Sequence, residues 1–246
     1  MRLQYYDLNI YQYGNEYKVI YFPRTYSDEL RNREHAPNAK IGDRFACNIS
    51  RSKNAILGLG LCNEWQYFTT FTLDKRKYDR YNLPGWREDF SQFIRNQRRL
   101  HNYDFKYLLI PEMHQDGAWH MHGLISGVPW KDLSKFDPAI HPIDLIKKGY
   151  RYYPAITERF GYNSFGKVRN QSAASRYVLK YVAKGMGVQD IDSGCSLYYC
   201  SQGLNRPEIV NQSSVGCLLT DVSFQNEYLA SSWIKQDEYE RICEYL

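Results

Sequence analysis

Residues 111–125 read PEMHQDGAWHMHGLI and contain three of the six histidines in this chain of 246 residues. The segments on either side, 105–114 and 119–125, are rich in the large apolar and aromatic residues that favour strands. Between them, QDG has the composition of a tight turn. The stretch therefore predicts a β-hairpin, and with it a sheet whose neighbouring strands are antiparallel.

The length of the loop decides which side chains share a face of this hairpin. With a three-residue loop over 115–117, whose last residue is left-handed and therefore usually glycine, Glu112 pairs with His120. The three histidines, at positions 114, 120 and 122, then project from the same face as Glu112, because side chains alternate along strands. A two-residue Asp-Gly loop would shift the register by one and send Glu112 and His114 to the other face.

Four potential ligands on two adjacent strands favour a metal site. Ordinary packing would need a separate hydrogen-bond partner for each imidazole and for the carboxylate, whereas one divalent ion satisfies them together. The predicted ligands are Glu112, His120 and His122, with His114 as an optional fourth. Such a set leaves coordination positions open, as a catalytic site requires. The competing interpretation is an accidental His-x-His on a half-exposed strand. A cupin site is disfavoured because no glutamate follows the second histidine at the required spacing.

The rest of the chain interleaves strands and helices. Helices are predicted over 50–65, 87–100 and 172–186, and from about residue 231. Further strands are predicted over 66–74, as extended pieces within 151–169, and in two segments after residue 195. This order predicts an α+β fold with a central, mainly antiparallel sheet flanked by helices.

Composition indicates a soluble globular protein, with 43% hydrophobic and 24% charged residues. No run of 18 uncharged apolar residues and no signal peptide is found, so a cytoplasmic protein without a membrane segment is expected. The six cysteines have no paired zinc-ligand spacing and are predicted to be reduced thiols. A net charge of +5 and 16% aromatic residues permit a nucleic-acid partner.

The segment YVLKYVAK (177–184) repeats a tyrosine followed three residues later by a lysine. The four side chains are those of Tyr177, Lys180, Tyr181 and Lys184. On a helix they share one narrow face, and the two tyrosine Cβ atoms lie about 5–6 Å apart. The alternative interpretation is a plain amphipathic helix that points its long side chains outward.

Three motifs thus follow one another: FTTFTLD (68–74), the His-hydrophobic-His of 120–122, and the doubled Tyr-x-x-Lys. In order and spacing they resemble the three motifs of HUH endonucleases. In particular, the chain is similar to the rolling-circle replication initiators of single-stranded DNA phages and small plasmids. The resemblance covers about residues 50–207, including SQGLNRPEI, which resembles a segment after the tyrosine helix in phage members.

The resemblance implies a ferredoxin-like palm in which the tyrosine-bearing helix packs near the His-x-His hairpin. It also implies a single nuclease domain over 1–246. The motif-bearing core is expected at about 64–188, with additions over 1–63 and 189–246.

The chemistry implied is the nicking of single-stranded origin DNA. Glu112, His120 and His122 would hold Mg²⁺ or Mn²⁺ at the scissile phosphate. Tyr177 or Tyr181 would attack it, leaving a 5′-phosphotyrosine link and a 3′-OH that primes synthesis, and the other tyrosine would serve when the strand is rejoined. The sequence does not rank the two tyrosines.

Lys180 and Lys184 would hold the attacking tyrosine or the phosphate through their charge. His114 departs from a strict three-ligand set. It could replace Glu112, assist it, or only form a hydrogen bond nearby.

Further basic and hydroxyl side chains are candidate contacts to the DNA backbone. They are Lys167, Arg169, Arg176 and Thr72. The neighbouring segment GYNSFGKV (161–168) nearly matches a phosphate-binding loop but has valine where the magnesium-binding hydroxyl should be. With no helicase domain implied, a host helicase and a polymerase are the expected partners.

Three other functions stay open. A relaxase would place its tyrosine before the histidines, as in YYDLNIYQY (5–13), but those tyrosines lack the paired lysines. A transposase of this superfamily would normally be smaller. A nonenzymatic binder of single-stranded nucleic acid would leave the strand intact.

Overall fold

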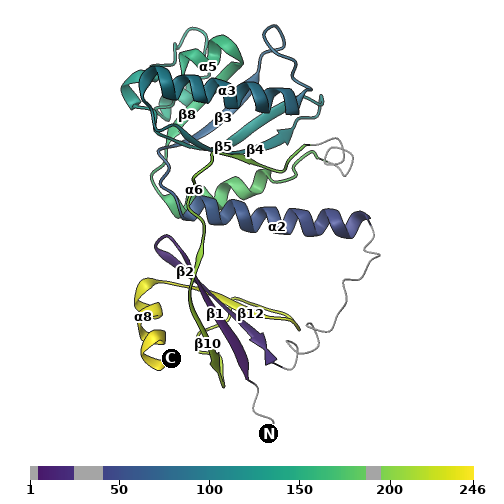
Figure 1. Cartoon of the computed structure of the whole chain (residues 1–246). Helices are drawn as coiled ribbons and strands as arrows, with labels where there is room; N and C mark the ends of the chain where they lie inside the picture. Colours follow the sequence, from purple (N-terminus) through teal and green to yellow (C-terminus); the bar gives the residue numbers. More distant parts are fainter. Residues whose placement is uncertain (1–4, 25–40, 187–194) are drawn as a thin grey trace. The chain divides into compact units, whose positions relative to one another are not determined.

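The computed structural model describes residues 5–24, 41–186 and 195–246, which form two compact units (Figure 1). The first unit contains residues 5–24, 61–63 and 205–246, and the second contains residues 41–60, 64–186 and 195–204. Each unit has its own sheet and its own hydrophobic core. That the whole chain acts as a single nuclease domain stays a prediction.

The second unit is built on a seven-stranded sheet in which every pair of neighbours is antiparallel. In spatial order its strands are β6 (Ser134–Lys135), β7 (Arg151–Tyr152), β8 (Gly161–Lys167), β3 (Tyr67–Leu73), β5 (Trp119–Ser126), β4 (Lys106–Met113) and β9 (Tyr199–Cys200). The predicted α+β class and antiparallel sheet are confirmed.

Helices cover both faces of this sheet. They are α2 (Ile41–Leu61), α3 (Leu83–His101), α4 (Ile143–Lys147), α5 (Pro154–Arg159) and α6 (Gln171–Tyr177), with 3-10 turns η1 (Trp130–Asp132) and η2 (Val178–Tyr181). Figure 1 shows α3 and α5 on one face, with α6 toward the other. The Asn82 side chain caps α3 by accepting a hydrogen bond from the Gly85 amide. Phe90 of α3 then packs against Phe71 of β3, with ring centroids 5.5 Å apart.

The hairpin has the predicted register. Glu112 lies opposite His120, and Ile110 lies opposite His122. The His114 amide donates to the Ala118 carbonyl, which closes a loop of three residues. Gly117 has φ +80°, a conformation that side chains with a Cβ rarely adopt. The interpretation with a two-residue loop is therefore wrong.

Two predicted helices have different bounds in the structure. The helix predicted over 50–65 is α2, which begins at Ile41 and ends at Leu61. The helix predicted over 172–186 keeps its α form only to Tyr177 and continues as the 3-10 turn η2. Ala183 and Gly185 then have positive φ, so the chain can no longer follow a helix.

Two further predictions need correction. The segment 151–169 is not wholly extended, because residues 154–159 form α5, with Pro154 in its first turn where proline is favoured. The C-terminal helix does not begin near residue 231. Residues 230–234 form a strand, and the helix α8 (Gln236–Tyr245) follows it.

The first unit combines the N-terminal and C-terminal parts of the chain in one five-stranded antiparallel sheet. Its spatial order is β10 (Glu208–Val215), β1 (Tyr6–Tyr13), β2 (Glu16–Pro23), β12 (Ala230–Ile234) and β11 (Phe224–Gln225). The ring of Tyr239 on α8 stacks on Tyr17 of β2, with centroids 4.2 Å apart. In the described parts of the chain, no helix has the length and apolar character needed to cross a bilayer.

Candidate active site on the histidine hairpin

Strand β3 supplies a hydroxyl partner for each histidine of β5. The register places Thr70 opposite His122 and Thr72 opposite His120. The Thr70 hydroxyl is 3.1 Å from His122 Nδ1, and the Thr72 hydroxyl is 3.3 Å from His120 Nδ1. Because each hydroxyl holds one ring nitrogen, it orients the ring and leaves Nε2 for another partner.

Glu112 joins the hairpin to the segment after the tyrosines. Its Oε2 is 2.7 Å from His122 Nε2, and its Oε1 is 2.5 Å from Lys184 Nζ. Burial is the largest influence on the Glu112 carboxyl and opposes ionisation, but the bond from Lys184 and the proximity of His122 lower its pKa. Glu112 is therefore a carboxylate at neutral pH.

Both histidines of β5 are neutral near pH 7. Burial lowers the pKa of His122 to about 4, despite the nearby Glu112. Burial, with His114 as a further cause, also lowers the pKa of His120. The contact between His122 and Glu112 is thus a hydrogen bond from a neutral imidazole. The Thr70 hydroxyl can donate or accept, so it satisfies either tautomer of His122.

The two tyrosines lie against this hairpin in different environments. The Tyr181 ring stacks on the His122 ring, with centroids 3.8 Å apart and planes 7° apart, and is only 8% exposed. Tyr177, at the end of α6, is 49% exposed, and its hydroxyl is 3.5 Å from that of Tyr181. The Phe68 and Tyr177 rings pack edge to face, with centroids 5.4 Å apart. The expected packing of the tyrosine-bearing helix near the hairpin is confirmed.

Lys180 makes the two phenols chemically unequal. Its ammonium donates to the Tyr177 hydroxyl and lies 3.6 Å from the centroid of that ring. This bond is the main reason that the pKa of Tyr177 is lowered. Burial, followed by the contact with Tyr177, raises the pKa of Tyr181 well above its usual value. Tyr177 is therefore the phenol that ionises more readily.

A backbone bond fixes the segment that follows the tyrosines. The Met113 amide donates to the Lys184 carbonyl at 3.1 Å, beside the Glu112 contact. The next residue, Gly185, has φ +75°, and a Cβ there would lie 2.2 Å from the Met113 carbonyl oxygen. Only glycine permits this close approach, which places Lys184 at Glu112.

His114 lies beside the predicted ligands but faces outward. Its ring is 5.0 Å from the His120 ring, and its Nδ1 is 3.6 Å from Asp116 Oδ1 in the exposed loop. The geometry is compatible with assistance to the site or with a local hydrogen bond.

The predicted ligands Glu112, His120 and His122 are residue types that suit a divalent cation. A carboxylate and two neutral imidazoles, oriented through Nδ1, are ligands that such ions accept. As the side chains stand, however, no three His, Cys, Asp or Glu residues within the described ranges form a group that could hold a metal ion. In this arrangement the two oxygens of Glu112 are directed to His122 and Lys184.

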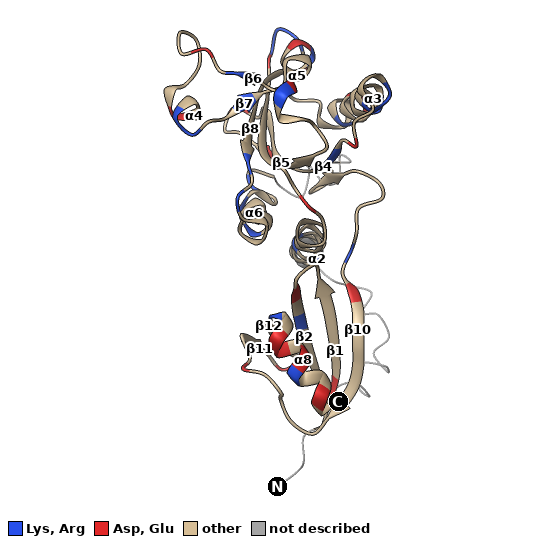
Figure 2. Ribbon diagram, turned by 90° about the vertical axis from the view of Figure 1, so that its left-hand side faces the viewer, with Lys and Arg blue, Asp and Glu red and all other residues tan. Residues whose placement is uncertain are grey.

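The candidate DNA contacts are spread over the unit. Thr72 lies beside His120. Lys167 extends over the Trp130 ring, and its Nζ is 4.5 Å from the ring centroid. Lys167 pairs with Tyr67, on the sheet face opposite the histidines. Arg169 is exposed between β8 and α6, and Arg176 is half-buried on α6. Figure 2 shows Lys and Arg segments at this end of β8 and along α6.

Sequence reasoning missed two residues of the site, Thr70 and Phe68. Both lie in FTTFTLD, and the alternation of β3 puts them on the same face as Thr72. That alternation is the available signal, but it becomes useful only once β3 is known to pair with β5.

The model of a family described as Replication-associated protein ORF2 matches residues 66–186. The matched segment contains the hairpin, both tyrosines and Lys184. No curated protein and no solved structure matches the chain.

Proposed function

The chain belongs, through residues 66–186, to the replication-associated protein ORF2 family of rolling-circle replication initiators of the HUH type, and we propose that it nicks single-stranded origin DNA. Nicking would proceed by tyrosine transesterification. The observation that carries this proposal is the contact of the tyrosine pair with the hairpin, in which Tyr181 stacks on His122 and Tyr177 touches Tyr181.

Tyr177 is the proposed first nucleophile, because it is exposed and its pKa is lowered. Its phenolate oxygen would form a bond to the scissile phosphorus, and the bond from phosphorus to the 3′ oxygen would break. The 3′ oxygen takes up a proton and leaves as a 3′-OH. The downstream strand stays linked to the protein as a 5′-phosphotyrosine.

The other groups of the site position the reactants. Lys180 stabilises the Tyr177 phenolate, and Lys184, which is largely exposed, can turn from Glu112 toward a phosphate. A divalent ion such as Mg²⁺ or Mn²⁺, held by Glu112, His120 and His122, would offset the charge that builds up on the scissile phosphate. Tyr181 would supply the second nucleophile for rejoining.

The product of this step determines the partners proposed for the protein. A free 3′-OH is a primer end, so a polymerase of the host would extend it. Because the substrate is single-stranded, a host helicase would have to open the duplex.

A covalent-adduct assay tests the proposed nicking. The protein is incubated with Mn²⁺ and a pool of single-stranded oligonucleotides of randomised sequence, labelled at the 3′ end, and is then denatured. A labelled protein band is expected, because the 5′-phosphotyrosine link retains the 3′ portion of the strand. The band should vanish in the Tyr177→Phe, Tyr181→Phe double variant. A protein that binds the pool without forming an adduct under any metal condition would instead be a binder.

The pH dependence of adduct formation should respond to Lys180. Lys180→Met removes the main cause of the lowered pKa of Tyr177. The phenolate fraction at neutral pH then falls, about tenfold for each pKa unit, and recovers as the pH is raised. The rising limb of the rate profile should therefore move to higher pH, while Lys180→Arg should keep it near its original position. A lower rate with an unchanged pH midpoint would show that Lys180 does not act on the phenol.

A further inference from the structure

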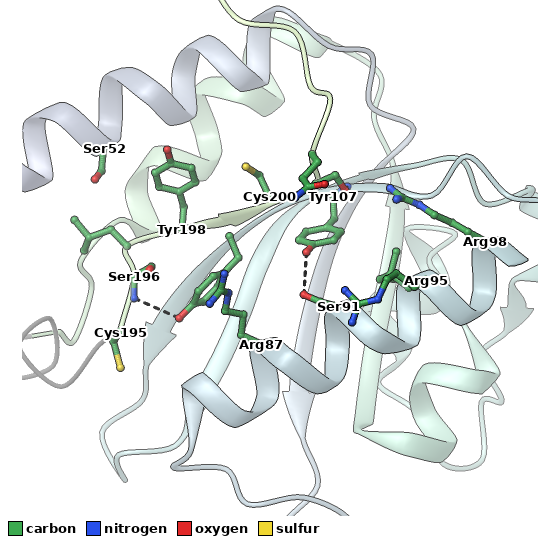
Figure 3. Close-up of a pocket in the computed structure, with 15 residues that line it drawn as sticks. Ser52, Arg87, Ser91, Arg95, Arg98, Tyr107, Cys195, Ser196, Tyr198 and Cys200 are labelled. Atoms are coloured by element: carbon green, nitrogen blue, oxygen red, sulfur yellow. Dashed lines mark hydrogen bonds between the residues drawn. The ribbon is translucent and has the colours of Figure 1, made fainter.

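A polar pocket lies on the face of this sheet opposite the histidine hairpin (Figure 3). It has a volume of about 730 Å³ and is formed by α3, β4 and the segment around β9. Tyr107 of β4 points into it and contacts Phe90 of α3, with ring centroids 5.4 Å apart. Glu112 is five residues further along β4 and therefore faces the other side of the sheet. This α3 pocket is separate from the histidine hairpin.

Three arginines give the α3 pocket its charge. Arg87, Arg95 and Arg98 come from one stripe of α3, with Ser91 between them. The described residues that line the pocket include no Asp or Glu, and none of the three guanidinium groups has a carboxylate within ion-pair distance in the described chain. Three neighbouring guanidinium groups without a neutralising carboxylate attract an anion.

The arginines are held in place yet keep donors for a ligand. Arg98 Nε donates to the Phe105 carbonyl at 2.9 Å, and Arg95 Nη2 donates to Gln92 Oε1 at 2.7 Å. Arg87 lies over the Tyr199 ring, 5.8 Å from its centroid. Each guanidinium has five N–H donors in a planar fork, so several remain for phosphate oxygens.

The spacing of the arginines selects the ligand. At 1.5 Å per residue, Arg98 lies about 16 Å from Arg87 along the axis of α3. This separation is larger than one phosphate group. A half-buried aromatic ring, that of Tyr198, also lines the pocket and makes no stacking contact with another ring of the described residues. Successive phosphates with an unpaired base beside them are the chemistry of a single nucleic-acid strand.

We propose that the α3 pocket binds the sugar-phosphate backbone of single-stranded DNA, with one base stacked on Tyr198. This second contact rests on the proposed function only in that single-stranded DNA is taken as the substrate. It holds a part of the strand away from the scissile phosphate, on the other face of the sheet.

Matched single variants on one helix test this assignment. Arg95→Gln removes a charge from the pocket, whereas Arg99→Gln removes one from an exposed position of α3 outside it. Both are placed in the Tyr177→Phe, Tyr181→Phe background with EDTA, so that no cleavage occurs. Binding of a labelled oligothymidylate is measured by fluorescence anisotropy over a range of salt concentrations.

Arg95→Gln should reduce the slope of log K against log salt by about 0.7, as expected for one lost phosphate contact. Adding Arg87→Gln should double that reduction and weaken binding at least about tenfold, and Tyr198→Ala alone should weaken it at least about fivefold. Arg99→Gln should leave the slope nearly unchanged. Equal slopes for Arg95→Gln and Arg99→Gln would overturn the assignment.

A competition experiment distinguishes binding of a DNA strand in the α3 pocket from binding of a free nucleotide. Millimolar thymidine triphosphate should not displace the oligonucleotide. If it does displace the oligonucleotide, and if this displacement is lost in Arg95→Gln, the pocket would be assigned to a free nucleotide instead. Unfolding midpoints of all variants confirm that they are folded. Because no step here requires cleavage, failure of the nicking proposal would appear only as a missing covalent adduct in the unaltered protein.

Discussion

Tyr177→Phe is expected to abolish the first covalent adduct with single-stranded DNA, with a rate loss of at least about a thousandfold. Tyr181→Phe should slow that first step by less than about tenfold, because its phenol is buried against His122 and its pKa is raised. The measurement is the initial rate at which a 3′-labelled strand becomes attached to the protein.

The second strand transfer should show the opposite dependence. Once Tyr177 carries DNA, rejoining requires Tyr181, so Tyr181→Phe should accumulate adduct and form little joined product. Tyr245→Phe, at a position 84% exposed on α8, is the matched control and should leave both steps unchanged. Equal losses of the first step in the two single variants would contradict the ranking of the tyrosines.

Glu112→Gln is expected to slow adduct formation at least about a hundredfold. The amide keeps the shape of the side chain but removes the charge that would attract a divalent ion. Mn²⁺ should raise the unfolding temperature of the unaltered protein, because an ion that binds only the folded state stabilises it. This rise should be lost in Glu112→Gln.

Two variants separate this effect from other consequences of the change. Asp104→Asn, at an exposed carboxylate paired with Lys106, should behave as the unaltered protein does. Lys184→Met breaks the contact with Glu112 but keeps the carboxylate, so the Mn²⁺ response should persist. Full activity of the unaltered protein in EDTA would rule out a role for a metal ion.

The hairpin can be predicted closely because its information is local. The loop length and Gly117 fix the register, and the period of two then assigns Glu112, His120 and His122 to one face. The amphipathic pattern of α3 is equally clear, although its first turn, with Pro84, precedes the predicted start at residue 87.

The rest of the site depends on contacts between distant parts of the chain. Thr70 becomes a partner of His122 only through the pairing of β3 with β5, which are separated by some 50 residues in sequence. The pattern over 177–184 fits one face of a helix, but the bond between Met113 and Lys184 favours a chain that leaves the helix early. Tertiary contacts override local helix propensity here.

The C-terminal end of the chain is uninformative for the same reason. The segment that forms β12 predicts the start of a helix, because ASSWI has no strong strand signal by itself. It forms a strand by pairing with β2, more than 200 residues away in sequence. This C-terminal segment lacks its partner when it is considered alone.

The change from α6 to the 3-10 turn η2 at Tyr177 has a consequence for the two proposed strand transfers. In an unbroken helix, moving one phenol would move the other, since both would belong to a rigid cylinder. Here Tyr181 belongs to a short turn of a kind that often serves as a hinge. In the proposed reaction, Tyr181 would leave His122 by local rewinding of that turn, while a strand attached to Tyr177 would keep its place.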